Sequence, residues 1–199
     1  MKDNGTKSKI IAAAEELFKQ KDYEDIAIRE ICQLAGISIG AFYRYMGSKE
    51  KLFKVFHVKK GTEIARLILE QTDNKAPVDK IIIIINIYLD FILRYGYKFV
   101  KYFLLLSLKN ELFAAPPGAI DTFLKVYITE AFDKGEFDPK YTVDYVYRAL
   151  YSSLRGATFD WCLNSGQNDL RSAYSSTLNI LLDEFMNSKN KTPAKNLVQ

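Results

Sequence analysis

The sequence has few of the residues that carry catalysis and metal binding. Among 199 residues there is one histidine, His57, and there are two cysteines, Cys32 and Cys162. A two-histidine metal site, or a cysteine–histidine pair with a third partner, is hard to build from so few residues. No Walker loop and no G-x-G-x-x-G pattern is present either. We therefore expect no enzyme, no metal site and no cofactor.

Long hydrophobic runs are absent as well. The most apolar stretch, residues 81–93, carries Asn86 and Asp90, so it is too short and too polar to span a bilayer. The first residues, MKDNGTKSK, lack the apolar region of a secretory signal. Both cysteines sit in apolar helical patterns, as expected of reduced core thiols. We expect a cytoplasmic protein without membrane association.

Positive charge is concentrated at one end of the chain. Residues 1–60 contain 12 Lys and Arg against 8 Asp and Glu, a balance of +4, while the remainder holds 16 of each. The whole net charge therefore lies in the first third of the chain. An excess of four is modest, but it is placed as a nucleic-acid footprint would be.

The first third also contains a helix-turn-helix pattern, IREICQLAGISIGAFYRYM at residues 28–46. Apolar residues recur at helical spacing before Gly36, and glycine ends a helix without the steric penalty that other residues pay. Ser38 can cap a second helix. Phe42 and Met46, four residues apart, can face the first helix. This unit places its second helix in the DNA major groove.

The outer side of that second helix has two interpretations. Gly40 weakens a helix by about 1 kcal/mol relative to alanine. A glycine at this position would be explained if another molecule must approach the backbone closely there. Tyr43, Arg44 and Tyr45 offer groups suited to phosphates and base edges. Lys49 opposes the dipole of the following helix, so it is either a phosphate contact or a solvated surface lysine. An ordinary helical hairpin with exposed aromatic residues fits this stretch equally well.

The rest of the chain predicts further helices. Thr6 can cap a first helix that ends near Asp22. Pro77 begins an apolar, central helix, which Gly96 separates from a sixth one. Three more helices follow the break at residues 116–118, and residues 187–199 are polar enough to be disordered. The fold class is all-α, with about nine helices.

Three pieces of the sequence, AAAEELFKQKDY, IREICQLAGISIGAFYRYM and SKEKLF, occur in order within residues 6–56. In them the chain resembles the N-terminal domain of the tetracycline-repressor (TetR) family of bacterial transcription regulators. Ile39 departs from the family pattern, since a polar or basic residue is common there. Asp22 and Ala27 depart from a usual glycine and a usual Ser/Thr cap.

The resemblance implies a helix-turn-helix DNA-binding domain at 1–56, a helical ligand-binding and dimerisation domain at 57–187, and a tail at 188–199. The protein would be a homodimeric repressor that leaves its operator DNA when a small, largely apolar effector binds. One alternative is a DNA-bound adaptor that recruits a protein partner and has no effector. Another is a helical-bundle enzyme or lipid carrier.

Candidate site residues follow from these patterns. The predicted DNA contacts are Arg29, Ser38, Ile39, Gly40, Ala41, Tyr43, Arg44, Tyr45 and Lys49. The predicted effector contacts are bulky aromatic residues and one arginine in an otherwise uncharged stretch, namely Tyr102, Phe103, Tyr127, Tyr151, Arg155 and Trp161. If Arg155 faces a cavity, the effector carries an acidic group. The predicted dimer contacts, on the last two helices, are Ser153, Gly156, Leu178 and Leu182.

Overall fold

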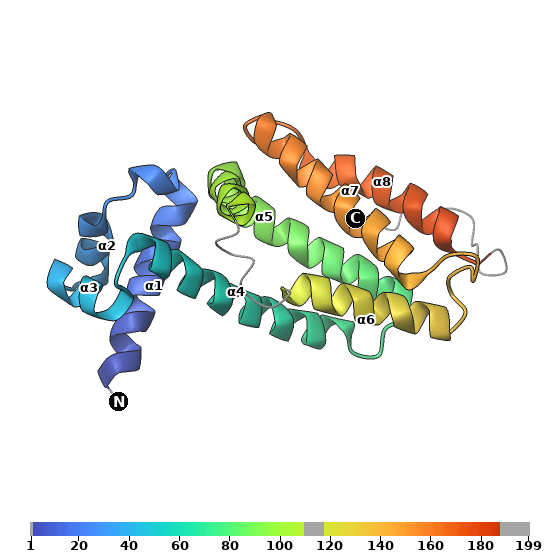
Figure 1. Cartoon of the computed structure of the whole chain (residues 1–199), viewed down its shortest axis with the longest axis horizontal. Helices are drawn as coiled ribbons and strands as arrows, with labels where there is room; N and C mark the ends of the chain where they lie inside the picture. Colours follow the sequence, from blue (N-terminus) through green and yellow to red (C-terminus); the bar gives the residue numbers. More distant parts are fainter. Residues whose placement is uncertain (1, 110–117, 188–199) are drawn as a thin grey trace. The chain divides into compact units, whose positions relative to one another are not determined.

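The computed structural model describes residues 2–109 and 118–187, and within these ranges it is built from helices (Figure 1). This confirms the all-α class. The elements are α1 (Lys2–Gln20), the 3-10 helix η1 (Tyr23–Asp25), α2 (Ile28–Ala35), α3 (Ile39–Met46), α4 (Lys49–Thr72), α5 (Pro77–Leu108), α6 (Ala119–Asp133), α7 (Val143–Leu163) and α8 (Leu170–Phe185).

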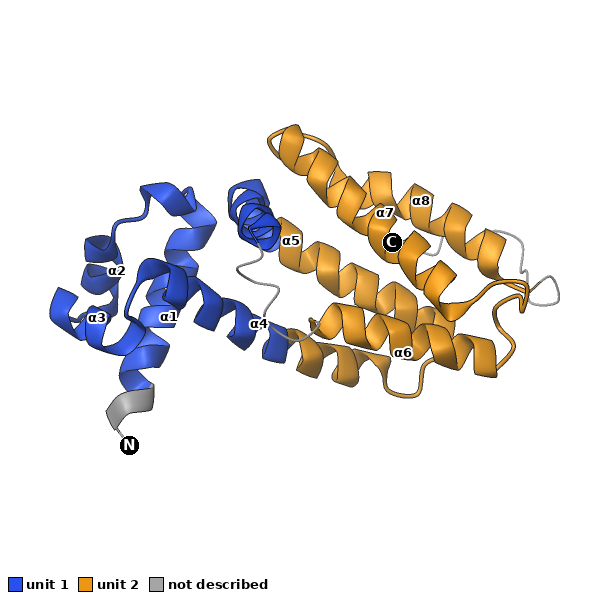
Figure 2. Cartoon of the chain, in the orientation of Figure 1, with its two compact units in different colours: residues 1–63, 94–114 blue, residues 64–93, 115–199 orange. Residues whose placement is uncertain are grey.

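The chain divides into two compact units (Figure 2). Unit 1 comprises Met1–Glu63 and Arg94–Ala114, and unit 2 comprises Ile64–Leu93 and Ala115–Gln199. The division falls within α4 and α5. The functional division predicted at residue 56 concerns the roles of the segments, so it stays a prediction. The predicted tail at 188–199 lies outside the described residues.

Gly96 interrupts α5, as its place in the sequence predicted. Its backbone has φ 76° and ψ 165°, values that are not helical and that favour glycine because it has no Cβ. The predicted fifth and sixth helices are therefore the two parts of α5, before and after the kink at Gly96. The count of about nine helices becomes eight for the described residues when these two parts are taken together.

The start of the first helix was predicted wrongly. Helix α1 begins at Lys2, so Thr6 lies inside the helix and does not cap it. The weakest helix former in this stretch, Gly5, costs only about 1 kcal/mol, which is too little to stop a helix. At the other end, α1 stops at Gln20, and Asp22 has an ordinary φ of −59°.

Unit 1 is held together by an apolar core and by an aromatic cluster. The core residues come from α1, α2 and α3 and are all buried: Leu17, Phe18, Ile31, Ala35, Phe42 and Met46. Phe18 also lies against Phe53, Phe56 and Phe99, with ring centroids 5.6, 5.2 and 5.7 Å away. These rings join α1, α4 and the part of α5 after Gly96. The helix-turn-helix is thereby fixed on a well-packed base.

Unit 2 is a helical bundle. Helices α6, α7 and α8 each bury one apolar stripe, and the isoleucine-rich part of α5 buries most of its circumference. Arg171 of α8 donates to Asn86 and Asp90 of α5, and these bonds join the two helices. An isolated antiparallel bridge between Phe137 and Met186 ties the end of α8 to the loop before α7.

Candidate nucleic-acid interface

Two capping residues set the geometry of the turn between α2 and α3. Gly36 is left-handed, with φ 65° and ψ 40°, and ends α2. The Ser38 Oγ accepts a hydrogen bond from the Ala41 N–H at 3.1 Å and so begins α3. Both features were predicted from the sequence, and both are confirmed. They fix which residues of α3 point inward and which point outward.

Helix α3 has one buried side and one open side. Phe42 and Met46 are 0% and 5% exposed, and they hold the helix on unit 1. Ile39 and Tyr43 are 48% and 52% exposed, and Arg44 is exposed as well. The buried pair accounts for the packing of α3, so the open side has no structural task within the chain.

Gly40 lies on this open side and has no reason within the protein to be glycine. A Cβ built there meets no atom within 4 Å, and the residue is not among those with positive φ. Glycine in the first turn of a helix costs stability, yet the fold does not require it. Space for a molecule outside the chain remains the physical explanation.

Arg44 is held by its neighbour on the helix. Its guanidinium lies 4.9 Å from the Tyr45 ring centroid and donates to the Tyr45 hydroxyl at 3.3 Å. Tyr45 is half-buried, which orients the pair. Guanidinium groups bind phosphates or guanine edges in two-pronged fashion, so a pre-oriented Arg44 suits either contact.

Lys49 has a structural role that the sequence did not predict. Its ammonium donates to the carbonyl oxygens of Tyr23 and Ile26 at 2.8 and 2.9 Å, with Glu24 O at 3.4 Å. It also lies 4.3 Å from the Tyr23 ring centroid. Burial lowers the pKa of this lysine. Its three donors are directed at the η1 loop, so we do not retain Lys49 among the proposed phosphate contacts.

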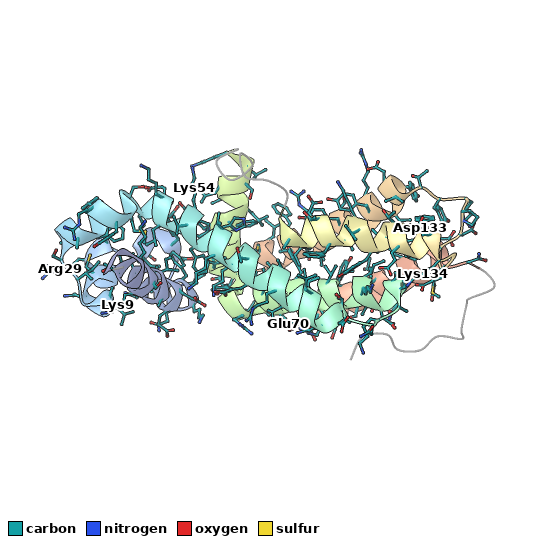
Figure 3. The ribbon with its side chains drawn as sticks, turned by 90° about the horizontal axis from the view of Figure 1, so that it is seen from below. Lys9, Arg29, Lys54, Glu70, Asp133 and Lys134 are labelled. Atoms are coloured by element: carbon teal, nitrogen blue, oxygen red, sulfur yellow. The ribbon has the colours of Figure 1, made fainter. Side chains whose placement is uncertain are left out.

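Other basic side chains frame α3. Arg29 is exposed on α2 (Figure 3), and Lys51 and Lys54 are exposed in the first turns of α4. Lys51 folds back over the turn after α3, with its Cδ 3.3 Å from where a Cβ on Gly47 would lie. Arg29 was predicted as a DNA contact, whereas Lys51 and Lys54 were not. The signal for Lys51 was the SKEK sequence at residues 48–51, of which only Lys49 was predicted as a contact.

The start of α2 is capped from within the helix. Ala27 has no capping side chain, but the Glu30 carboxylate accepts the Ala27 N–H at 3.0 Å. Lys21 also donates to Glu30, and the two bonds, that of Lys21 first, lower the carboxyl pKa. The unfavourable Ala27 noted in the sequence is therefore compensated three residues later.

Residues 36–40 spell G-I-S-I-G, the letters of the hydrolase pattern G-x-S-x-G. In hydrolases that serine sits on a sharp turn between a strand and a helix. Here Ser38 follows α2 and caps α3, and its oxygen is engaged with Ala41. The chain therefore matches the hydrolase pattern in sequence but not in structure.

The predicted effector contacts fall in different units. In unit 1, Tyr102 stacks on Tyr23 with ring centroids 3.7 Å apart, and the ring centroids of Phe103 and His57 are 5.1 Å apart. In unit 2, Tyr127 is buried and its hydroxyl lies 2.8 Å from the Thr72 Oγ1. The first two residues thus belong to the packing of unit 1.

Helix α7 carries the remaining predicted effector contacts. Trp161 is 5% exposed, whereas Arg155 is exposed and lies 5.7 Å from the Tyr151 ring centroid. The condition for an acidic effector, a buried Arg155, is therefore not met. Burial raises the pKa of Tyr151, and it raises that of nearby Tyr88 to about 12. The structure thus brings tyrosines of α5 and α7 together, a grouping that the sequence did not reveal.

Two of the predicted dimer contacts are wrong. Leu178 and Leu182 are 1% and 0% exposed, because they fill the core between α8 and its neighbours. Ser153 is half-buried and lies 3.2 Å from the Tyr174 hydroxyl of α8. Only Gly156 is exposed, and a Cβ there would meet nothing within 4 Å.

Some kinds of site are not found in the described part of the chain. Residues 2–109 and 118–187 contain no cluster of three or more side chains of the types that hold a metal ion. Within the same ranges, no helix has the length and apolar character needed to cross a membrane.

Comparisons with known proteins agree with this geometry. Residues 10–55 match the model of a family described as bacterial regulatory proteins, tetR family. A search of curated proteins found no significant match. Among solved structures, the transcriptional regulator FadR from Bacillus subtilis, in complex with stearoyl-CoA, has a TM-score of 0.71 and 21% identity, covering 89% of this chain and 98% of its own.

Two further structures share the fold. FadR from Bacillus halodurans has a TM-score of 0.70 and 21% identity, over 89% of this chain and 94% of its own. SmeT, the repressor of a Stenotrophomonas maltophilia multidrug efflux pump, has a TM-score of 0.71 and 15% identity, over 96% of this chain and 95% of its own. Residues 10–55 therefore resemble the tetR family of bacterial regulatory proteins, and the chain shares its all-helical fold with these solved structures.

Proposed function

We propose that this protein is a homodimeric repressor that binds operator DNA through α3 and releases it when a small, largely apolar effector binds in unit 2. The observation that carries DNA reading is the open side of α3, where Ile39, Gly40, Tyr43 and Arg44 are exposed while Phe42 and Met46 hold the helix. Arg29, Lys51 and Lys54 are placed to neutralise phosphates on either side of the helix.

The direct test of DNA reading starts from a random duplex library. Full-length protein selects sites, and affinity for the selected site is compared with that for shuffled duplex at two salt concentrations. We expect a site preference that Arg44→Ala reduces. Lys54→Ala should weaken binding to both duplexes alike and lower the slope of log affinity against log salt concentration by about one. Equal affinity for selected and shuffled duplex would contradict the proposal.

The dimer interface is proposed on the outer sides of α7 and α8. Phe159, Leu163 and Ile180 are 51%, 67% and 70% exposed, unusually open for large apolar side chains. Ser152 and Gly156 continue the same side of α7, since residues 152, 156, 159 and 163 follow helical spacing. Two such surfaces can bury one another around a two-fold axis, as an isologous interface requires.

The effector site is proposed in unit 2, around Tyr88 and Tyr151. Both have pKa values raised by burial, and the Tyr88 hydroxyl lies 3.4 Å from the Thr158 Oγ1. Hydroxyl groups among aromatic and isoleucine side chains suit a ligand with a long apolar part and few polar atoms. The bound stearoyl-CoA of the B. subtilis FadR structure supports an effector of this kind.

An effector would act by shifting the population of dimer geometries. The two copies of α3 must reach half-sites about 34 Å apart, and a ligand that prefers another spacing weakens DNA binding by its difference in affinity. Trp161 is the only tryptophan of the chain and lies on α7, so its fluorescence reports on this region. Stearoyl-CoA, palmitate and a short-chain control should be titrated into the protein–operator complex. An operator complex indifferent to all of them would instead favour the adaptor alternative.

A further inference from the structure

We propose that Ile39 is a specificity-determining residue, which selects thymine by contact with the 5-methyl group in the major groove. This inference rests on the proposed function, since it names what the first turn of α3 reads. It concerns the position at which the sequence departs from the family pattern, where an apolar residue replaces a polar or basic one.

Ile39 is placed where a reading helix meets base edges. It is the first residue of α3, directly after the Ser38 cap, and 48% of its surface is exposed. The N-terminal residues of the second helix are those that contact bases in this motif. Packing does not explain the isoleucine, since Phe42 and Met46 supply the buried contacts of α3.

The rest of this first turn leaves little for hydrogen-bonded base reading. Gly40 and Ala41 carry no polar atoms on their side chains, and the Ser38 oxygen already accepts the Ala41 N–H. The open space around Gly40 allows the groove edge to approach closely. A flat, apolar turn with one projecting branched side chain is what a methyl group can pack against.

Of the four standard DNA bases, only thymine offers such a group in the major groove. Thymine carries a 5-methyl beside its O4 acceptor, whereas adenine and guanine present N7 acceptors and cytosine presents an amino donor. Isoleucine has no group that can hydrogen-bond to these polar atoms. Where it covers them, they lose water without gaining a partner, which costs binding free energy. The same side chain therefore favours thymine and disfavours the other bases.

The experiment uses the full-length protein and the duplex that it selects from a random library. Each thymine of one half-site is replaced in turn by deoxyuridine, which removes only the methyl group. At one position we expect affinity to fall about fourfold, the contribution of one buried methyl group. Changing both half-sites should lower it about sixteenfold. Deoxyuridine at the remaining thymines should have little effect.

Variants assign the effect to Ile39. In Ile39→Ala the deoxyuridine penalty should vanish at that position, whereas in Arg44→Ala it should persist although overall affinity is lower. Cytosine at the same position should bind more tightly when it is 5-methylated, and Ile39→Ala should lose this gain. Ile39 is half exposed, so thermal unfolding of Ile39→Ala should match the wild type and confirm that the variant is folded.

Three results would overturn the inference. The wild type could be indifferent to every deoxyuridine substitution, Ile39→Ala could keep the full penalty, or the affected position could respond to Arg44→Ala instead. In each case site-specific binding itself would remain, so the proposed function would stand. Loss of any preference for the selected duplex in the wild type would remove both.

Discussion

Helix α3 and the pair α7–α8 differ in how well their sequences indicate which side chains are exposed. In α3 every outward residue was predicted as a contact, and Ile39, Gly40, Tyr43 and Arg44 are all exposed. In α8 the two predicted contacts, Leu178 and Leu182, are buried, while Ile180 is 70% exposed. The predicted contacts are therefore exposed in one helix and buried in the other.

The difference comes from what each prediction took to be the outer side of the helix. Helix α3 is short and capped at Ser38, and its two core residues leave a single other side. Helix α8 has one continuous apolar stripe, and the two predicted contacts lie on it, although that stripe fills the protomer core. Ile180 stands alone on the other side, among Ser176, Thr177 and Glu184, so periodicity does not single it out.

The largest effect should separate the two sides of α3. Phe42→Ala removes a ring that is 0% exposed and should destabilise the protein by about 3–5 kcal/mol. Tyr43→Ala, on the neighbouring exposed residue, should change stability by less than about 0.5 kcal/mol but weaken operator binding. Urea unfolding and operator affinity, measured on both variants, check this. A strongly destabilised Tyr43→Ala would contradict our division of the helix.

The second effect should separate the two sides of α8. Leu182→Ala should lower stability by about 2–5 kcal/mol because it leaves a cavity in the protomer. Ile180→Glu should instead place charges face to face across the proposed dimer interface and raise the dissociation constant of the dimer at least tenfold. Sedimentation at several concentrations measures the dissociation constant.

Gly156→Leu provides the matched test on α7. The protomer has open space there, so its fold should tolerate the side chain, while close approach of a second copy should not. A wild-type protein that is monomeric at micromolar concentration and still binds operator tightly would count against the interface.

A third, smaller effect concerns the base of unit 1. Glu15 of α1 accepts hydrogen bonds from Tyr95 at 2.7 Å and pairs with Lys60 at 2.9 Å. Burial alone would raise its carboxyl pKa, but the bonds from Lys60 and Tyr95 outweigh burial and lower it. The stabilisation is therefore complete above the unfolded pKa near 4.5 and is lost as pH falls through the lower folded value.

Replacement of Glu15 should reveal this dependence. Glu15→Gln should cost about 1–2 kcal/mol at pH 7, the contribution of hydrogen bonds to a charged group. The difference from wild type should shrink as pH falls from about 5 to 3. Glu16→Gln, an exposed neighbour on the same helix, is the control and should show neither change. A constant difference across this range would show that the charge of Glu15 is not what stabilises the unit.

The sequence predicted features that depend on neighbouring residues, and it failed where distant segments meet. Gly36, Ser38 and the break at Gly96 follow from local backbone preferences, and all three were predicted. Lys49 was misjudged because its carbonyl partners lie more than twenty residues earlier in the chain. The pairing of Asp90 with Arg171 is likewise not visible in the sequence, since Arg171 lies on another helix.

The effector contacts show the same limit on a larger scale. Tyr102 and Tyr151 look alike in sequence, as aromatic residues in apolar helices. The structure assigns Tyr102 to unit 1, where it stacks on Tyr23, and Tyr151 to unit 2. An aromatic-rich stretch therefore indicated a core, but only the fold shows which unit each aromatic residue helps to pack.

The smallest effect on stability is the most informative for the reading surface. Gly40→Ala adds a methyl group in open space and restores helix propensity, so it should stabilise the protein by up to about 1 kcal/mol. If Gly40 leaves room for the groove edge, the same methyl group should weaken operator binding, because it holds the backbone away from the bases. The two changes have opposite signs, so a damaged fold cannot produce the second.

Gly61→Ala is the control for this prediction. Gly61 lies inside α4 and likewise has open space around its Cβ position, so the substitution should raise stability and leave operator affinity unchanged. Thermal unfolding and operator titration, run side by side on both variants, measure the two quantities. If Gly40→Ala binds the operator as tightly as the wild type, the DNA does not approach α3 at its first turn. Base reading would then have to move to Tyr43 and Arg44, one turn further along the helix.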